Sequence, residues 1–232
     1  MEIIAEIGQN HNGDIALARE LIHSAKESGA DVAKFQVYDA RALFPKEGNA
    51  WYEYNCKTEL SRDQIGKLAE ECRRVGIEFM ASVFDVERVA WLEEVDVKRY
   101  KIASRSIRDM ALITTLAATG KPLLASLGMW EGATFPEIKN AANVDFLYCI
   151  SKYPTPLSDL YLSQVDFGVY AGFSDHTVGI TASIAALARG AKVLEKHYTL
   201  DKAMSGPDHA GSMKPDELAE INAFRNDLRQ CL

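Results

Sequence analysis

The chain has 232 residues, of which 47% are hydrophobic and 25% are charged, so it is long and apolar enough for a globular protein with a sizeable core. Its formal net charge is −7, and it lacks the basic runs interleaved with aromatic residues that nucleic-acid backbones require, so we exclude nucleic acid as a partner. An acidic protein can still bind a small anion in a locally basic pocket.

Strand-like and helix-like segments alternate along the whole chain. The expected strands are Glu2–Ile7, Asp31–Val37, Glu78–Val83, Arg99–Ala103, Pro122–Ser126, Asp145–Cys149, Gly168–Phe173 and Lys192–His197. The expected helices are Ile15–Ser28, Arg62–Val75, Val86–Glu94, Asp109–Thr119, Thr134–Ala142, Leu157–Val165, Ile180–Arg189 and Pro215–Leu232. Eight of each predict an α/β fold, a (β/α)8 TIM barrel, and the lack of a linker predicts a single domain over residues 1–232.

Glycines punctuate several expected helix ends, at Gly29, Gly76, Gly120 and Gly190, each shortly before a strand. This spacing favours short connections at one end of the barrel. The longer loops, Tyr38–Ser61 and Thr199–Lys214, then lie at the other end, where the carboxyl ends of the strands carry the catalytic groups of TIM barrels.

The cysteines and the N-terminus indicate where in the cell the protein is expected. Cys56, Cys72, Cys149 and Cys231 show neither CxxC nor metal-type spacing, which favours a reducing compartment over a disulfide framework. The chain opens on a strand without a basic leader, and no apolar span of roughly 18 residues occurs. We therefore expect a cytoplasmic protein that does not associate with membranes.

Polar side chains recur at the expected strand ends. Lys34 and Lys101 lie inside otherwise apolar strands, and a lysine that points into a barrel must have a partner there. Several serines follow at neighbouring strand ends. Ammonium groups and hydroxyls together suit a small, doubly anionic ligand, although each serine on its own is as readily a helix cap or turn residue.

Two histidines end the last two strands. If these strands are adjacent and parallel, His176 and His197 project at the same edge and can supply nitrogen ligands to a divalent metal, with Asp175 and Asp208 close in sequence. The alternative is that each histidine is simply hydrogen-bonded in packing.

Seven segments of the chain, taken together, resemble those of a known protein family. AEIGQNHNGD, GADVAKFQ, YKIAS, YCISKYPTP, GFSDHTVGI, GAKVLEKHYTLD and GPDHAGSMKPDEL, in this order, resemble the sialic acid synthase (N-acetylneuraminate synthase) family over nearly the whole chain. The resemblance implies a barrel that condenses phosphoenolpyruvate with N-acetylmannosamine or a related sugar aldehyde. It also implies a divalent metal, usually Mn²⁺, with Mg²⁺ or another divalent ion as the alternative.

The resemblance assigns roles to individual residues. His176 and His197 would bind the metal, and Lys34 and Lys101 would hold the carboxylate and phosphate of phosphoenolpyruvate. Hydroxyl donors around that substrate would be Ser82, Ser104, Ser126, Ser151 and Ser174. The residues facing the sugar would be Glu6, Gln36, Tyr153 and Asp208, with Glu6 and Asp208 counted with the two lysines as catalytic, and Asn10 and His11 would support them from the first loop.

The implied reaction follows from charge. C3 of phosphoenolpyruvate attacks the metal-activated aldehyde carbon, water adds at the electron-poor C2, and the tetrahedral intermediate expels phosphate. The product would be a 3-deoxy-2-keto sugar acid of the sialic or nonulosonic type.

The chain departs from the family pattern in three places. Many members carry an acid two positions after Ser104, where this chain reads Arg105-Ser106; we expect Arg105 either to face a more anionic acceptor or to point outward toward Asp109. Ser151 replaces a common asparagine, and Leu127 a common threonine. The chain ends at Leu232, where family members usually continue into an antifreeze-like domain that contacts the sugar.

These departures keep alternatives open. The acceptor could be another aldose or aldose phosphate, as in related 3-deoxy-keto acid synthases, or the barrel could bind metal and ligand without turnover. The partners expected from the family are a second copy in a homodimer or a separate antifreeze-like subunit. His209 is more readily a substrate or solvent contact than a third metal ligand.

Overall fold

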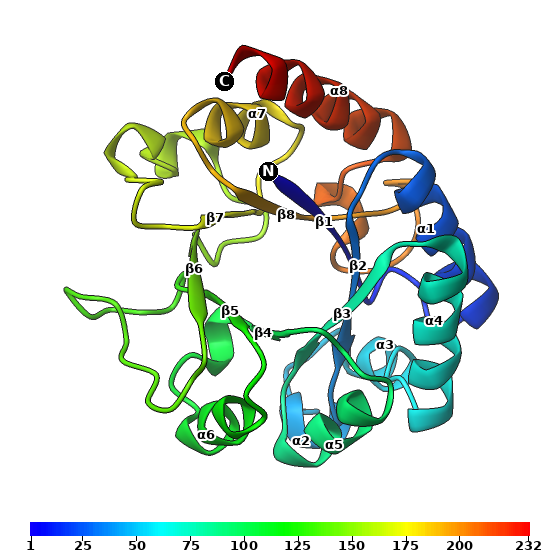
Figure 1. Ribbon diagram of the computed structural model, residues 1–232. Helices are drawn as coiled ribbons and strands as arrows, with labels where there is room; N and C mark the ends of the chain where they lie inside the picture. The colour runs from blue at the N-terminus through cyan, green and yellow to red at the C-terminus, as the bar shows by residue number, and fades with distance from the viewer.

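The computed structural model describes residues 1–232 as a closed barrel of eight parallel strands in sequence order (Figure 1). The strands are β1 (Glu2–Gly8), β2 (Val32–Val37), β3 (Glu78–Val83), β4 (Tyr100–Ile102), β5 (Leu123–Ser126), β6 (Val144–Cys149), β7 (Gly172–Asp175) and β8 (Val193–His197). The predicted single-domain (β/α)8 fold is therefore confirmed.

The helices that surround the barrel are α1 (Ile15–Glu27), α4 (Arg62–Val75), α5 (Val86–Glu94), α6 (Met110–Ala118), α7 (Thr181–Ala188) and α8 (Pro215–Cys231). Local sequence explains where several of them begin and end. Asp14 accepts hydrogen bonds from the first turn of α1, and Ser61 and Gln64 form a capping box at α4. Gly76 ends α4 in the left-handed conformation, with φ of 76°.

Side chains inside the barrel form two layers. The lower layer is apolar and consists of Ile4, Val32, Met80, Leu124, Leu147 and Val193. Two residues further along the same six strands lie Glu6, Lys34, Ser82, Ser126, Cys149 and Glu195. Because alternate residues of a strand face the same side, this second layer is polar and rests directly on the apolar one.

Two of the expected helices are absent, on the side of the barrel formed by β5 and β6, where Figure 1 shows irregular segments in place of covering helices. Residues 134–142 form no helix: Asn140 has φ of 63°, and Phe135 packs instead against Phe146 and Tyr170 at 4.8 Å between ring centroids. The expected helix Leu157–Val165 is reduced to two 3-10 turns, η2 (Leu157–Asp159) and η3 (Leu162–Gln164). Tyr161, with φ of 45°, separates them.

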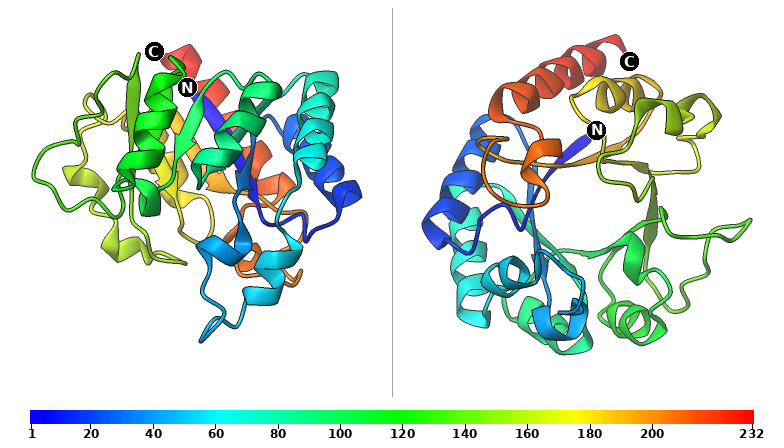
Figure 2. Two further views of the ribbon diagram at one scale, coloured as in Figure 1. Left: turned by 90° about the horizontal axis from the view of Figure 1, so that it is seen from below. Right: turned by 180° about the vertical axis from the view of Figure 1, so that it is seen from behind.

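The two ends of the barrel differ. Figure 2 shows the segments after β2 and β8 projecting from one end, while both termini lie at the other. The segment after β2, expected as one long loop, contains two short helices, α2 (Ala40–Leu43) and α3 (Tyr52–Lys57). None of the helices combines the length and the apolar character needed to cross a bilayer.

Closure between β7 and β8 requires a glycine at position 172. A Cβ atom there would lie 1.8 Å from the carbonyl oxygen of Val193, which is backbone and cannot rotate away. We expect Gly172→Ala to lower the free energy of unfolding by at least about 1–3 kcal/mol, because the strands must separate. Urea unfolding measures this.

The matched control is Gly66→Ala in α4, where an added Cβ meets nothing within 4 Å. That change should stabilise the helix by about 0.5–1 kcal/mol. Equal unfolding free energies for the two variants would show that β7 and β8 tolerate a wider separation.

Candidate active site

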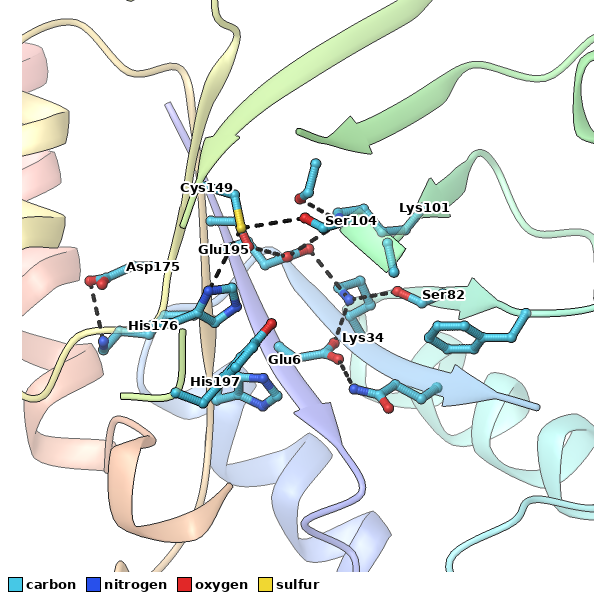
Figure 3. A pocket seen from close by; sticks show the side chains of 17 residues that line it. Glu6, Lys34, Ser82, Lys101, Ser104, Cys149, Asp175, His176, Glu195 and His197 are labelled. Carbon is cyan, nitrogen blue, oxygen red and sulfur yellow. Dashed lines mark hydrogen bonds and ion pairs between the residues drawn. The ribbon is translucent and has the colours of Figure 1, made fainter. Parts of the chain in front are cut away.

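The polar layer at the carboxyl ends of the strands lines a narrow chamber of about 60 Å³, called here the inner chamber (Figure 3). Four charged side chains from four strands alternate across its floor. Lys34 Nζ lies 2.6 Å from Glu6 Oε2 and 3.4 Å from Glu195 Oε2, and Lys101 Nζ lies 3.6 Å from Glu195 Oε1. Each of the four residues is at most 5% exposed.

The surroundings of Lys34, Lys101 and Glu195 shift their pKa values in different directions. Burial acts to lower the pKa of Lys34, but Glu195 and Glu6 outweigh it and raise the pKa above its ordinary value. Lys101 has one carboxylate within ion-pair distance, and burial lowers its pKa. Burial acts to raise the pKa of Glu195, but Lys101 and Lys34 outweigh it and hold the pKa at about 2.

Serine hydroxyls complete the inner chamber. Lys34 donates to Ser82 Oγ at 3.0 Å, Lys101 donates to Ser126 Oγ at 2.7 Å, and Ser174 Oγ donates to Glu195 at 2.8 Å. Ser104 Oγ accepts from the Gly128 amide at 3.1 Å. The predicted lysines and four of the five predicted serines therefore lie together, which is the donor set that a small anion needs.

The inner chamber opens into a wider one of about 680 Å³, called here the outer chamber. Predicted residues on its wall are Gln36, Ser104, Arg105, Ser151, Tyr153, His197 and Asp208. Ser151 lines this chamber and not the inner one, with its Oγ buried and without a hydrogen-bond partner. It is thus set apart from the other four serines, and its role as a hydroxyl donor to phosphoenolpyruvate stays a prediction. Phe44, Trp51 and Asn55, from the segment after β2, also line the outer chamber.

Two imidazoles face each other where the chambers meet. The ring centroids of His176 and His197 are 5.9 Å apart, and Tyr153 lies 4.2 Å from the His176 ring. His176 Nδ1 lies 3.0 Å from the Ile150 carbonyl oxygen, which leaves Nε2 free. His197 Nδ1 is buried without a hydrogen-bond partner and lies 4.0 Å from Asp208 Oδ2.

This arrangement fits a divalent metal with open coordination positions. An orphaned buried nitrogen and a facing imidazole are suitable ligands, and no third His, Cys, Asp or Glu completes a cluster with them. The two histidines would be the protein ligands, and the remaining positions would be left to water or substrate oxygens.

The loops after β1 and β8 hold each other in place. Asn10 Nδ2 donates to the Tyr198 carbonyl and to Ser212 Oγ at 2.9 and 3.0 Å. His209 is fully buried, and its ring nitrogens lie 2.7 Å from Thr199 Oγ1 and 3.1 Å from Asn12 Oδ1. The expectation that His209 contacts substrate or solvent is therefore wrong, because both of its nitrogens are used in fixing the loop that carries Asp208.

Two residues of the inner chamber escaped the sequence reasoning. Glu195 precedes His197 by two positions in β8, so the period of a strand places both inside the barrel. Cys149 ends β6, with Sγ 3.7 Å from His176 Nδ1 and 3.5 Å from Ser104 Oγ. Strand alternation could have identified both, whereas the EKH segment directed attention to the histidine alone.

A second ion pair is formed by the residues that directly follow Ser174 in β7 and Glu195 in β8, and Figure 3 shows Asp175 directed away from Glu195 and Lys34. Asp175 and Lys196 are register partners in β7 and β8, with Nζ 3.2 Å from Oδ2, and both side chains are at most 1% exposed. Ser183 in α7 also donates to Asp175, at 2.5 Å. This pair fixes the strand ends from which His176 and His197 project.

The comparisons with known proteins agree with this geometry. The sequence profile of the NeuB family matches residues 21–231. The chain belongs to the NeuB family. The resemblance to sialic acid synthases seen in the sequence is thereby confirmed.

Individual relatives of the NeuB family match most of the chain. N,N'-diacetyllegionaminic acid synthase of Legionella pneumophila is 37% identical in an alignment of 247 positions that covers 94% of this chain and 69% of that protein. N-acetylneuraminate-9-phosphate synthase of Mus musculus is also 37% identical, over 94% of this chain and 67% of that protein. The crystal structure of N-acetylneuraminic acid (sialic acid) synthetase from Leptospira borgpetersenii is 32% identical, with a TM-score of 0.90 over 99% of this chain and 84% of that one.

The buried Asp175–Lys196 pair predicts an asymmetry between single and double variants. Lys196→Met leaves the Asp175 carboxylate buried without its cation, and we expect a loss of about 3–5 kcal/mol in the free energy of unfolding. Lys196→Met combined with Asp175→Leu removes both charges and should recover a large part of that loss. Urea unfolding of the three proteins tests this, and a double variant no more stable than the single one would contradict it.

The burial of His11 predicts that the folded protein loses stability in acid. It is fully buried, its Nε2 has no hydrogen-bond partner, and burial lowers its pKa from 6.5 to about 4. The unfolded chain therefore binds a proton at higher pH than the folded one, and the stability present above pH 6.5 is lost as the pH falls toward 4. For His11 alone the loss reaches about 3 kcal/mol.

His11→Gln should flatten the dependence of unfolding free energy on pH between about 6.5 and 4. Burial also lowers the pKa of His209, so part of the slope will remain. His23→Gln is the control, because His23 is on α1, is 40% exposed and pairs with Glu71. If the unfolding free energy of His11→Gln changed with pH as steeply as that of the wild-type protein, His11 would not be a source of the acid sensitivity.

Proposed function

We propose that this chain condenses phosphoenolpyruvate with a sugar aldehyde to give a 3-deoxy-2-keto sugar acid of the sialic or nonulosonic type, with release of phosphate. The observation that carries the proposal is the convergence of two buried lysines, four serines and two facing histidines on one pair of connected chambers. Membership of the NeuB family, whose named relatives are synthases of such acids, supports it.

The inner chamber is the proposed site for phosphoenolpyruvate. Lys34 and Lys101 already lie beside Ser82 and Ser126, so each ammonium group and its hydroxyl form a ready pair of donors. Phosphate and carboxylate oxygens would replace carboxylate neighbours with which the lysines now pair. The water-poor setting strengthens these contacts and fixes the reactive C3 toward the outer chamber.

His176 and His197 would hold a divalent ion, with Mn²⁺ expected, which when bound would polarise the aldehyde oxygen of the acceptor. The acceptor itself would lie in the outer chamber against Gln36, Tyr153 and Asp208. Asp208 lies close to His197 and is placed to orient, as a hydrogen-bond acceptor, the water that gives a proton to the aldehyde oxygen as it becomes a hydroxyl.

The carboxylates of the inner chamber serve the second half of the reaction. When C3 of phosphoenolpyruvate bonds to the aldehyde carbon, its double bond opens and C2 becomes electron-poor. Glu195 and Glu6 are the anions available to stabilise C2, and Glu6, hydrogen-bonded by Gln36 at 2.9 Å, is placed to take a proton from the water that adds there. The tetrahedral centre then expels phosphate and leaves the 2-keto group.

The proposal also concerns the identity of the acceptor sugar. One relative is named for a phosphorylated product and another for an unphosphorylated one, so the family does not fix the sugar. An N-acetylmannosamine-like acceptor leads, and another aldose or aldose phosphate is the alternative. A cytoplasmic location, and a second copy or an antifreeze-like subunit as partner, belong to the same proposal.

The alternative function is that of a non-catalytic protein, a barrel that binds metal and ligand without turnover. Such a barrel would use the buried Lys34 and Lys101 for its ligand as a synthase would, so turnover itself distinguishes the two functions. The discriminating assay is phosphate release with Mn²⁺, phosphoenolpyruvate and a panel of aldoses. Release with one or more acceptors supports a synthase, and no release with any acceptor overturns the proposal.

Within that assay, Lys101→Met should raise the KM for phosphoenolpyruvate by about 10- to 100-fold, because a charge-assisted contact of about 1.5–3 kcal/mol is lost. Lys46→Met is the control, since Lys46 is 76% exposed in the segment after β2. Chelation should abolish release and Mn²⁺ should restore it. Equal KM values for the two variants would contradict the placement of phosphoenolpyruvate in the inner chamber.

A further inference from the structure

Arg105 is a cation without an anion on the wall of the outer chamber. It follows β4, in the 3-10 turn η1 (Ser104–Ser106), and its guanidinium lies over the Phe44 ring at 5.4 Å from the centroid. Its one hydrogen bond is a long one, 3.4 Å to the Leu43 carbonyl oxygen. A guanidinium has five N–H donors, so most of its capacity is open to a ligand.

The other outcome expected from the sequence, a pairing of Arg105 with Asp109, does not occur. Asp109 instead accepts from the Leu112 amide at 3.0 Å and caps α6. No carboxylate lies within 4.0 Å of Arg105, whereas the neighbouring Arg108 pairs with Glu131 at 2.7 Å. The free guanidinium therefore faces the chamber and not an acid of its own chain.

The wall of the outer chamber carries charges of both signs. Asp208 lies beside His197, at the end where the aldehyde is expected. Arg105 is the single lysine or arginine on the wall of this chamber. Lys34 and Lys101 line the inner chamber, where they are the proposed partners of phosphoenolpyruvate, and do not line this one. A ligand that reaches from the histidines along this chamber meets one unopposed positive charge.

The contact with Phe44 also orients that charge. An aromatic face that carries a guanidinium holds its plane without consuming its N–H groups, which stay directed at the edges. A planar fork presented in this way matches two oxygens of a carboxylate or a phosphate better than a hydroxyl or an amide.

We propose that Arg105 determines acceptor specificity by binding an anionic group, a carboxylate or a phosphate, at the end of the sugar remote from its aldehyde. The inference rests on the proposed function and narrows it: the acceptor is an acidic sugar or a sugar phosphate. The same positive charge gives a neutral acceptor no comparable contact.

The test uses three acceptors that differ at one carbon: a 2-acetamido hexose, its 6-phosphate and its 6-carboxylate. Phosphate release from phosphoenolpyruvate with Mn²⁺ gives kcat and KM for each acceptor. The wild-type protein should prefer one or both anionic acceptors, and the better of the two identifies the group. The preference should weaken as the salt concentration rises.

Arg105→Gln should raise the KM for the preferred anionic acceptor on the order of 10- to 100-fold, and should change the KM for the neutral acceptor far less. Arg105→Lys keeps the positive charge but lacks the planar guanidinium. Its KM for the anionic acceptor should lie between the values for the wild-type protein and for Arg105→Gln. Arg41→Gln is the matched control, because it removes the same charge from α2, beside the Leu43 and Phe44 that contact Arg105, at a position that does not line the chamber. A neutral acceptor as good as the anionic ones, or an equal loss for all three in Arg105→Gln, overturns the inference.

Calorimetric binding of the three acceptors, with Mn²⁺ present and phosphoenolpyruvate omitted, separates this inference from the proposed function. Tighter binding of an anionic acceptor that is lost in Arg105→Gln, together with no phosphate release, supports the role of Arg105 and rejects the synthase. Phosphate release with no anionic preference in binding or in KM supports the synthase and rejects the role of Arg105.

Discussion

The structure depends on four alternating buried charges, Glu6, Lys34, Glu195 and Lys101, which cross the barrel from strand to strand. None of them is tolerable alone at this depth, because a buried unpaired ion is strongly destabilising. Together they also fix register. A slip of one residue in any of these strands would turn a charge out of the chamber and into the apolar packing between strands and helices.

That network lies directly on the apolar layer of the barrel, and this placement organises the rest of the site. The charged groups cannot lie deeper in the barrel, because Ile4, Val32 and Val193 fill the space below them. They are therefore held at the depth where the chamber begins, with their open sides toward it. Electrostatic preorganisation of this kind costs little at the moment of reaction, since the dipoles and charges are already oriented by folding.

Much of this could be predicted from sequence because a barrel repeats simple rules. Lysines inside apolar strands and histidines at the ends of adjacent strands identified the carboxyl-terminal end and most of the inner chamber. Glu195 follows from the same rules, because it precedes His197 by two positions in β8. The position of Ser151 was not predictable, because it lies beyond the end of β6, where the chain direction is set by loop packing and not by a periodic pattern.

The helices that were wrongly expected have a different explanation. The segments 134–142 and 157–165 have helical spacing of apolar residues but are only about two turns long, too short to form without strong packing. Their apolar residues were instead captured by tertiary contacts, such as that of Phe135 with Phe146 and Tyr170. Short segments of this kind are decided by their neighbours, which a single sequence does not reveal.

The missing helices leave the barrel wall unevenly supported. β1, β2 and β3 are backed by α1 and α4, whereas the outer face of β6 is covered by a loop whose aromatic rings stack on it. The outer face of β6 therefore rests on side-chain packing and lacks the backbone hydrogen bonds of a covering helix. A ligand held by Lys34 in β2 and Ser126 in β5 would join the helix-backed wall to the strand beside β6, so that occupancy of the chamber would also brace the barrel.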